Sequence, residues 1–120
     1  MKKILIVEDV EMNIDLLTQL LEDDYELVIA RDGAQGVALA EQEHPAAILM
    51  DMSLPVMDGW EATRRIRANA QLQNIPVIGL SAHAMSGDAE KALAAGCNAY
   101  LTKPVDDALL LARLTEFLGN

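Results

Sequence analysis

The run Ala47-Ile48-Leu49-Met50-Asp51 places four apolar residues directly before an acid. A short, unbroken apolar run of this kind is typical of a strand that is buried on both faces of a parallel sheet. The segment Trp60–Arg67, entered through Asp58-Gly59, has the pattern of a helix. We therefore take a strand over 47–50 followed by a helix over 60–67 as the repeating unit of the fold.

Four further strand–helix pairs surround this unit. The predicted strands are Lys3–Val7, Leu27–Ala30, Pro76–Leu80 and Ala99–Thr102, and the predicted helices are Glu11–Glu22, Ala34–Gln42, Gly87–Ala95 and Asp107–Leu118. Strands that alternate with helices predict a parallel sheet covered by helices on both faces. The fold class is therefore α/β, and residues 1–120 are expected to form one domain without an output domain.

The composition narrows the class of protein. Hydrophobic residues make up 52% of the 120 residues, which is enough for a core, and aromatic residues only 3%, so that core must be aliphatic. The net charge of −10 argues against direct binding to nucleic acid. The single cysteine, Cys97, allows no internal disulfide, fits a reducing compartment and is expected to be a small buried residue.

No membrane segment or leader is expected. The apolar run near the N-terminus stops at Glu8-Asp9, too early for a signal peptide. No stretch approaches the ~20 apolar residues that a membrane-spanning helix needs. The sequence therefore predicts a soluble, cytoplasmic protein that does not bind membranes.

Polar residues follow all five predicted strands. Arg31-Asp32, after the second strand, is expected at the edge of the sheet, and the other four strands are followed by Glu8-Asp9, Asp51, Ser81 and Lys103. Singly, such residues are usually helix caps, solvated charges or partners of nearby backbone. In open α/β sheets, however, ligands bind beyond the carboxyl ends of the strands, so these side chains should converge. Neighbouring carboxylates repel unless positive charge compensates them. Lys103 supplies one such charge, and Mg²⁺, which prefers oxygen ligands, would supply two more.

These residues, over essentially the whole chain, resemble those of a response-regulator receiver domain. The matching positions are Glu8-Asp9, Asp51, Ser81-Ala82 and Lys103-Pro104, and the segment Asp51-Met52-Ser53-Leu54-Pro55-Val56-Met57-Asp58-Gly59 is similar to the acceptor loop of that family. The resemblance implies a flavodoxin-like (βα)5 three-layer sandwich with strand order 2-1-3-4-5. It also implies a phosphoacceptor in a two-component or phosphorelay system, which is not expected to turn over external substrates.

The resemblance assigns the chemistry to the strand ends. Asp51 would accept a phosphoryl group from a phosphohistidine of a histidine kinase or a histidine phosphotransfer protein. Mg²⁺, or Mn²⁺ as a substitute, would be held by Asp9, Asp51 and the backbone carbonyl of Ser53. Glu8 would hold a metal-bound water. Lys103 would pair first with Asp51 and later with a phosphoryl oxygen.

The resemblance also implies a switch. The Ser81 hydroxyl would donate to the phosphoryl group, and Tyr100 would rotate into the space that the Ser81 loop vacates. The surface formed by the fourth helix, fifth strand and fifth helix would then change for a downstream target. Ser53 and His83 would tune the lifetime of the phosphoryl group. The Lys103-Pro104 bond is expected to be cis.

Docking residues near the site are expected at positions that flank it. These are Val10, Asn13, Ile14 and Pro104, and the position of Asn13 is compatible with either the core or the partner surface. The stretch Val10-Glu11-Met12-Asn13 resembles receivers of hybrid kinases, so both a free-standing regulator and a receiver from a larger kinase stay open.

Three other functions compete with this interpretation. An aspartyl phosphatase of similar fold would carry a second Asp two residues after the nucleophile, where this chain has Ser53. A flavin or dinucleotide binder would need a Gly-rich phosphate loop after the first strand, where Glu8-Asp9 would repel phosphate. A scaffold that has lost phosphorylation is disfavoured by the complete set of acids, hydroxyl and lysine.

Overall fold

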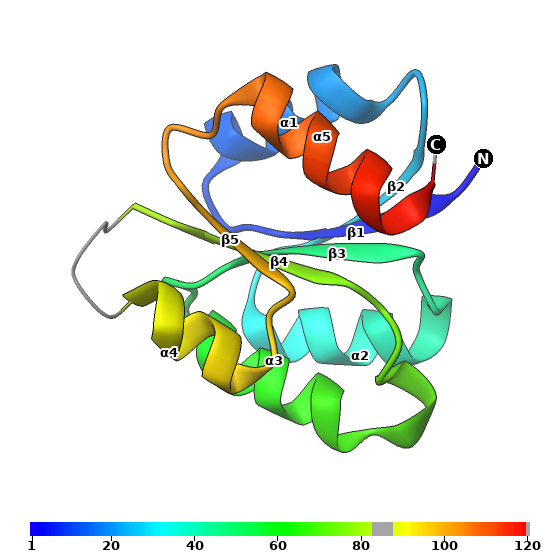
Figure 1. The fold of residues 1–120 in the computed structure, drawn as a ribbon. Coiled ribbons are helices and arrows are strands. Elements are labelled where there is room, and N and C mark those ends of the chain that lie inside the picture. The colour runs from blue at the N-terminus through cyan, green and yellow to red at the C-terminus, as the bar shows by residue number, and fades with distance from the viewer. Residues whose placement is uncertain (83–87, 120) are drawn as a thin grey trace.

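The computed structural model describes residues 1–82 and 88–119. The elements follow each other as strand and helix from the N-terminus onward (Figure 1). They are β1 (Lys3–Val7), α1 (Glu11–Leu21), β2 (Glu26–Ala30), α2 (Gly33–Glu43), β3 (Ala47–Asp51), α3 (Gly59–Ala68), the short 3₁₀ helix η1 (Ala70–Leu72), β4 (Val77–Ser81), α4 (Asp88–Ala95), β5 (Ala99–Thr102) and α5 (Asp107–Leu118).

The strands form a single parallel sheet in the order β2-β1-β3-β4-β5. Helices α1 and α5 cover one face of this sheet, and α2, α3 and α4 cover the other (Figure 1). The predicted flavodoxin-like sandwich and its strand order are therefore confirmed. Among the described residues, no helix is both long and apolar enough to cross a membrane.

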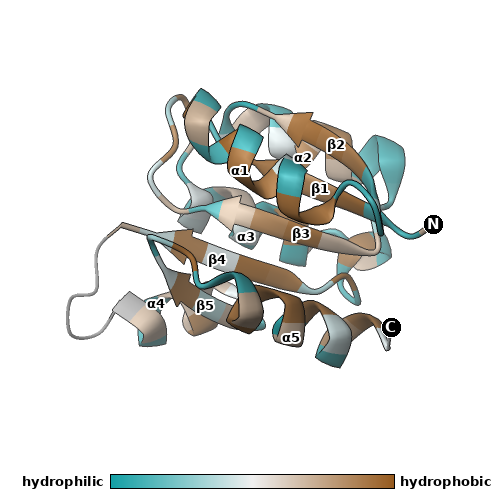
Figure 2. Cartoon of the chain, turned by 90° about the horizontal axis from the view of Figure 1, so that it is seen from above, coloured by the Kyte–Doolittle hydropathy of each residue, from teal (hydrophilic) through white to brown (hydrophobic). Residues whose placement is uncertain are grey.

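The core consists of two apolar clusters, one on each face of the sheet. Alternate residues of β1 divide between them, because successive side chains of a strand point to opposite faces. Leu5 belongs to the cluster under α2, α3 and α4, and Ile6 belongs to the cluster under α1 and α5. The strands are accordingly hydrophobic along most of their length (Figure 2). Cys97 is buried as predicted, and burial raises the pKa of its thiol.

The predicted elements differ from the observed ones mainly at their ends. Asp51 and Ser81, which we expected just beyond their strands, are the last residues of β3 and β4. Gly59 is the first residue of α3, because Asp58 is its N-cap and accepts a hydrogen bond from the backbone N–H of Glu61. The short helix η1 is not among the predicted elements, and the predicted start of the fourth helix at Gly87 lies outside the described residues.

Two cationic side chains hold α4 and its C-terminal loop against α3. The Lys91 ammonium lies 4.9 Å from the centre of the Trp60 ring, a cation–π contact. The Arg67 guanidinium donates to the carbonyl of Gly96 at 2.8 Å and to the side-chain oxygen of Asn98 at 2.7 Å. The C-terminal end of α4 is therefore anchored to the end of α3.

Candidate functional site

The parallel sheet brings the predicted polar residues to one edge. Each of them ends or follows a strand, and the carboxyl ends of parallel strands lie at the same edge of a sheet. The backbone N–H of Lys103 donates to the carbonyl of Ser81 at 2.7 Å, which ties the end of β5 to the end of β4. The Lys103-Pro104 bond is cis, as predicted.

Asp51 lies at the centre of this edge and is buried. One carboxylate oxygen, Oδ1, accepts a hydrogen bond from the backbone N–H of Ser53 at 3.0 Å. The other, Oδ2, lies 3.3 Å from the Lys103 ammonium. The side chain is therefore oriented by its own loop on one side and by a cation on the other.

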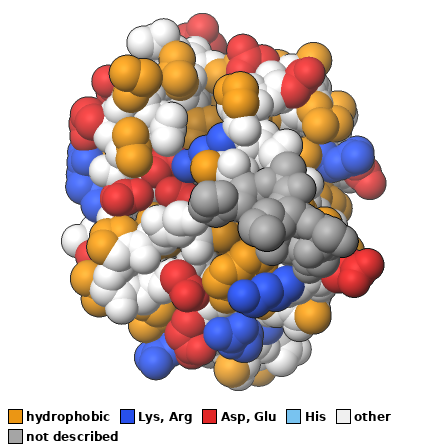
Figure 3. All heavy atoms as spheres, turned by 90° about the vertical axis from the view of Figure 1, so that its left-hand side faces the viewer, with side chains coloured by type: hydrophobic (Ala, Val, Ile, Leu, Met, Phe, Trp, Pro, Cys, Tyr) orange, Lys and Arg blue, Asp and Glu red, His pale blue; other side chains and the backbone are white. Residues whose placement is uncertain are grey.

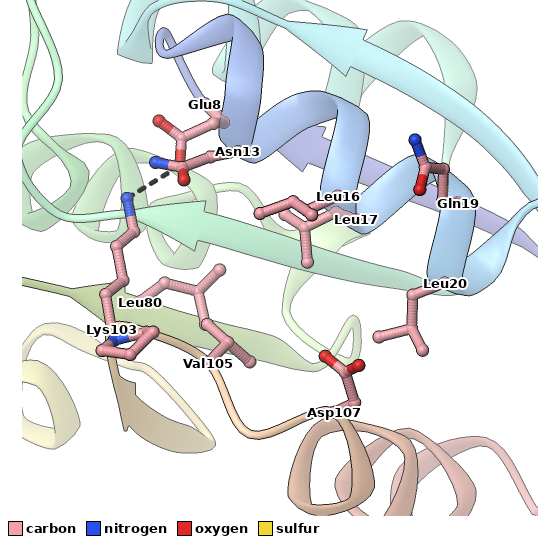
Figure 4. Close-up of a pocket in the computed structure, with 11 residues that line it drawn as sticks. Glu8, Asn13, Leu16, Leu17, Gln19, Leu20, Leu80, Lys103, Val105 and Asp107 are labelled. Atoms are coloured by element: carbon pink, nitrogen blue, oxygen red, sulfur yellow. Dashed lines mark hydrogen bonds and ion pairs between the residues drawn. The ribbon is translucent and has the colours of Figure 1, made fainter.

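The Glu8 carboxylate is only 1% exposed and has more partners than Asp51. Its Oε1 atom accepts a hydrogen bond from the Lys103 ammonium at 2.7 Å (Figure 4). Its Oε2 atom accepts from the backbone N–H groups of Asp9 and Val10 at 3.0 and 3.1 Å. The expected pairing of Lys103 with Asp51 is present, and the same ammonium also pairs with Glu8, to which it lies nearer.

The electrostatics of the site favour a charged lysine. Burial of Lys103 opposes its charge, but the hydrogen bond to Glu8 and the attraction of Asp51 outweigh that effect and raise the pKa of Lys103. The side chain is 18% exposed, so water screens these interactions only in part. Lys103 is therefore a permanent cation at neutral pH.

The site holds three carboxylates beside this one cation. Glu8, Asp9 and Asp51 each offer an oxygen, and these atoms all lie within 4.8 Å of one another. Carboxylates held so close repel one another unless positive charge relieves them, and Lys103 offsets only one. An oxygen-only set with an exposed Asp9, open to water ligands, suits a hard divalent cation such as Mg²⁺.

Comparison with known proteins agrees with this geometry. Residues 4–115 match the family described as "Response regulator receiver domain". The chain belongs to the response-regulator receiver family. It is a receiver domain of two-component signalling. Its curated relatives include the polar-differentiation response regulator DivK of Brucella ovis, which is 38% identical to it over 120 residues. The aligned residues are 99% of this chain and 98% of that relative.

Solved structures of receivers are also similar. One is the receiver domain of the sensor histidine kinase PA1611 from Pseudomonas aeruginosa PAO1, whose structure has a magnesium ion coordinated in the active site cleft. It has a TM-score of 0.91 and 42% sequence identity to this chain, and the match covers 99% of this chain and 98% of that one. The receiver domain of Ssk1 from Saccharomyces cerevisiae, crystallised with the histidine phosphotransfer protein Ypd1, has a TM-score of 0.88 and 33% identity, covering 97% and 88%.

Ser81 and Tyr100, the expected switch residues of the receiver, differ in how deeply they are buried. Ser81 is buried at the end of β4, directly opposite Thr102 in the register of β5. Tyr100 is half-buried on β5 and packs against the apolar cluster under α2, α3 and α4. His83 lies outside the described residues. The roles of these side chains as switch and lifetime residues stay predictions.

The expected docking residues are only partly at the receiver surface. Val10 is 47% exposed, Pro104 is exposed, and Asn13 is half-buried. The prediction for Ile14 is wrong, because this side chain is 4% exposed and packs inward from α1. In its place the structure exposes Met12 and Leu16, on the same helix, with fractions of 71% and 58%.

A cleft of about 410 Å³ opens beside the acids between α1 and the start of α5. Three leucines of α1 and Val105 point into it, with Glu8 and Lys103 at one end (Figure 4). On the face shown in Figure 3, acidic side chains lie beside basic ones with hydrophobic side chains around them. A charged centre with an apolar surround is a common layout for a protein interface.

The loop between β3 and α3 carries backbone strain that the sequence does not predict. Val56 has a φ of 67°, in the left-handed region that a β-branched residue rarely adopts. Its side chain is 85% exposed, so packing does not account for the conformation. The backbone here approaches α2 closely: a Cβ on Gly33 would lie 1.9 Å from the carbonyl oxygen of Met57. The backbone of this loop therefore lies in direct contact with the first residue of α2.

Val56→Gly is expected to raise the free energy of unfolding by about 1 kcal/mol, because glycine adopts this φ without steric cost. Chemical denaturation would measure the change. Val56→Ala, which removes the exposed methyl groups but keeps a Cβ, should give a smaller gain. An equal gain in both variants would show that the exposed side chain, and not the backbone conformation, limits stability.

Proposed function

We propose that this receiver accepts a phosphoryl group on Asp51 from a phosphohistidine of a partner protein, in a reaction that requires Mg²⁺. The observation that carries the proposal is the Asp51 carboxylate, buried among acids that could hold a metal and 3.3 Å from a permanent cation. The magnesium ion described in the PA1611 receiver domain supports it.

In the transfer, a carboxylate oxygen of Asp51 attacks phosphorus. The bond between phosphorus and the partner's imidazole nitrogen breaks, and its electron pair stays on that nitrogen. The product on this chain is an acyl phosphate. Phosphoryl transfer of this kind depends on positioning and on charge stabilisation more than on covalent chemistry by the protein. The Lys103 ammonium supplies positive charge where the phosphoryl oxygens of the product must lie.

Asp9, Asp51 and the backbone carbonyl of Ser53 would hold the ion, and Glu8 would contact it through water. When bound, Mg²⁺, or Mn²⁺ in its place, supplies the charge that neutralises phosphoryl oxygens next to carboxylates. The exposed position of Asp9 keeps this edge accessible to the ion.

The consequence of phosphorylation would be a switch at the surface of α4, β5 and α5. A phosphoryl group adds about −1.5 to −2 charges and strong acceptor oxygens. The Ser81 hydroxyl would donate to one of these oxygens, and Tyr100 would rotate inward beside it. The changed surface would bind or release a downstream protein, while Ser53 and His83 would set how long the phosphoryl group persists.

The partner in the transfer would be a histidine kinase or a histidine phosphotransfer protein. Ypd1, which was crystallised with the Ssk1 receiver, is a phosphotransfer protein of the second kind. The net charge of −10 makes nucleic acid an unfavourable partner for this domain, and we propose that it acts in the cytoplasm, without contact with membranes.

The test is phosphorylation by a small donor. Incubation of the protein with acetyl phosphate and Mg²⁺ should add a single phosphoryl group, seen as one mass increment in intact-mass spectra. Addition of EDTA in excess of Mg²⁺ should abolish the increment. Without the ion, the mutual repulsion of the carboxylates is no longer neutralised.

A matched sample with Ca²⁺ in place of Mg²⁺ controls for a general effect of divalent charge, since Ca²⁺ prefers longer bonds and more ligands. An increment that persists in EDTA would exclude the metal requirement. The absence of any increment with Mg²⁺, in a protein that melts cooperatively, would favour the scaffold alternative.

A further inference from the structure

Val56 lies at the apex of a tight turn that its residue type does not favour. The backbone N–H of Met57 donates to the carbonyl of Pro55 at 2.7 Å, which closes a three-residue γ-turn around Val56. With a φ of 67° at its central residue, this γ-turn is of the rare form that carries strain. Glycine or asparagine would adopt this φ at a lower cost than a β-branched residue. The choice of valine therefore destabilises the folded state at this position.

The rest of the loop does not let the turn relax. The carbonyl oxygen of Met57 packs so close to α2 that a Cβ on Gly33 would lie 1.9 Å from it. The carbonyl of Met52 accepts a hydrogen bond from the backbone N–H of Gly59 at 3.3 Å, which ties the two ends of the loop together. Strained backbone persists where the surrounding structure over-determines it, and such places cluster at functional sites. The turn therefore holds Val56 in a fixed position.

The Val56 side chain gains little burial inside the chain in return. It is 85% exposed and, among the described residues, belongs to neither apolar cluster of the core. Its neighbours differ, because Leu54 is buried and Met57 packs against the cluster under α2, α3 and α4. A single exposed apolar residue is common on protein surfaces, but this one also bears the cost of a strained backbone. A contact outside the chain would account for both features.

The turn lies beside the acceptor, where a protein donor must come close. Asp51 is the last residue of β3 and only 3% exposed, so a phosphohistidine can reach it only if the donor's surface lies against this edge of the sheet. The loop that carries Val56 begins directly after Asp51 and leads to α3 (Figure 1). The exposed Met12 and Leu16 belong to α1, which covers the opposite face of the sheet. Val56 therefore offers an apolar contact on the side of the sheet away from α1.

We propose that Val56 is a docking residue for the histidine phosphotransfer protein that serves as donor, and that it packs against an apolar side chain beside the donor's histidine. This inference rests on the proposed function, because it names a contact of the donor that phosphorylates Asp51. The strained turn and the stiff β-branched side chain are ordered before the donor arrives, which lowers the entropy lost on binding. A small donor such as acetyl phosphate needs no such contact, so Val56 should matter only for a protein donor.

The test compares a protein donor with a small one. Transfer to the receiver from phosphorylated Ypd1, with Mg²⁺ present, would be timed over a range of Ypd1 concentrations for wild type and for variants of Val56. Val56→Asn fits the left-handed φ but loses the apolar contact, so the Ypd1 concentration at half-maximal rate should rise about 10-fold, the size expected for burial of one valine side chain. The maximal rate should stay the same, because only binding is lost. Val56→Leu keeps an apolar side chain and should resemble wild type.

Val56→Gly separates the side chain from the backbone. It relieves the strain and removes the apolar side chain together, so it should weaken the use of Ypd1 as much as Val56→Asn does. A loss in Val56→Gly but not in Val56→Asn would assign the effect to a more flexible loop and overturn the proposal. An equal slowing of labelling by acetyl phosphate in these variants would also overturn it, because that donor has no docking surface.

Failure of the proposed function gives a different result. Wild type that takes up no label from acetyl phosphate with Mg²⁺ would contradict the proposed function itself. Wild type that is labelled by acetyl phosphate, but accepts nothing from Ypd1 or accepts from it as readily as Val56→Asn does, would contradict only the docking role of Val56.

Discussion

Asp51→Asn is expected to take up no phosphoryl group from acetyl phosphate under conditions that fully label wild type. The amide has the shape of the carboxylate, and its oxygen can still accept from the backbone N–H of Ser53, so the loop should keep its conformation. A neutral amide, however, is a far weaker nucleophile than a carboxylate. The substitution also removes a negative charge that would help to bind the metal. Intact-mass spectra should show the unmodified mass alone.

Asp58→Asn is the matched control, because it makes the same substitution at the other end of the loop that follows Asp51. Asp58 is exposed and caps α3, and asparagine caps helices about as well as aspartate. This variant should label like wild type. Labelling of Asp51→Asn at the wild-type level would mean that another residue is the acceptor, and the proposed function would be wrong.

Gly59→Ala is expected to cost about 3 kcal/mol of unfolding free energy, at the upper end for overpacking a core. A Cβ at this position would lie 2.4 Å from the carbonyl oxygen of Asp51 and 2.7 Å from the Cα of Met52. Both atoms belong to the backbone of the acceptor and of the residue after it, so relief requires the start of α3 to move away. Chemical denaturation would measure the loss, and the same shift should slow labelling of Asp51.

Gly79→Ala provides the comparison at another buried glycine. There a Cβ would lie 3.3 Å from the sulfur atoms of Cys97 and Met52, and side-chain ends can shift by a few tenths of an ångström. Its cost should stay below about 1 kcal/mol. If the two variants lose the same stability, close contact with the acceptor backbone is not what Gly59 relieves.

The sheet and the composition of the site could be predicted because both depend on patterns along the chain. Apolar runs alternate with helical segments, and the polar residues at the strand ends must converge once the sheet is parallel. This reasoning places Asp51 and Lys103 at the same edge of the sheet, where their side chains lie 3.3 Å apart.

Features that depend on three-dimensional distances could not be predicted. Nothing in the sequence distinguishes the Lys103–Glu8 contact of 2.7 Å from the Lys103–Asp51 contact of 3.3 Å. Ile14 was assigned to the surface because helical spacing alone did not show which side of α1 faces the sheet. The left-handed conformation of Val56 is contrary to the preference of its residue type, so no local rule would find it.

The contact between Lys91 and Trp60 gives this receiver an intrinsic optical signal. Trp60 is the only tryptophan in the chain, so all indole emission comes from the place where α4 meets α3. A nearby ammonium changes the electric field at an indole, and the emission therefore depends on the distance between these helices. If α4 moves when a ligand or a phosphoryl group arrives, the emission of the unlabelled protein would change in real time.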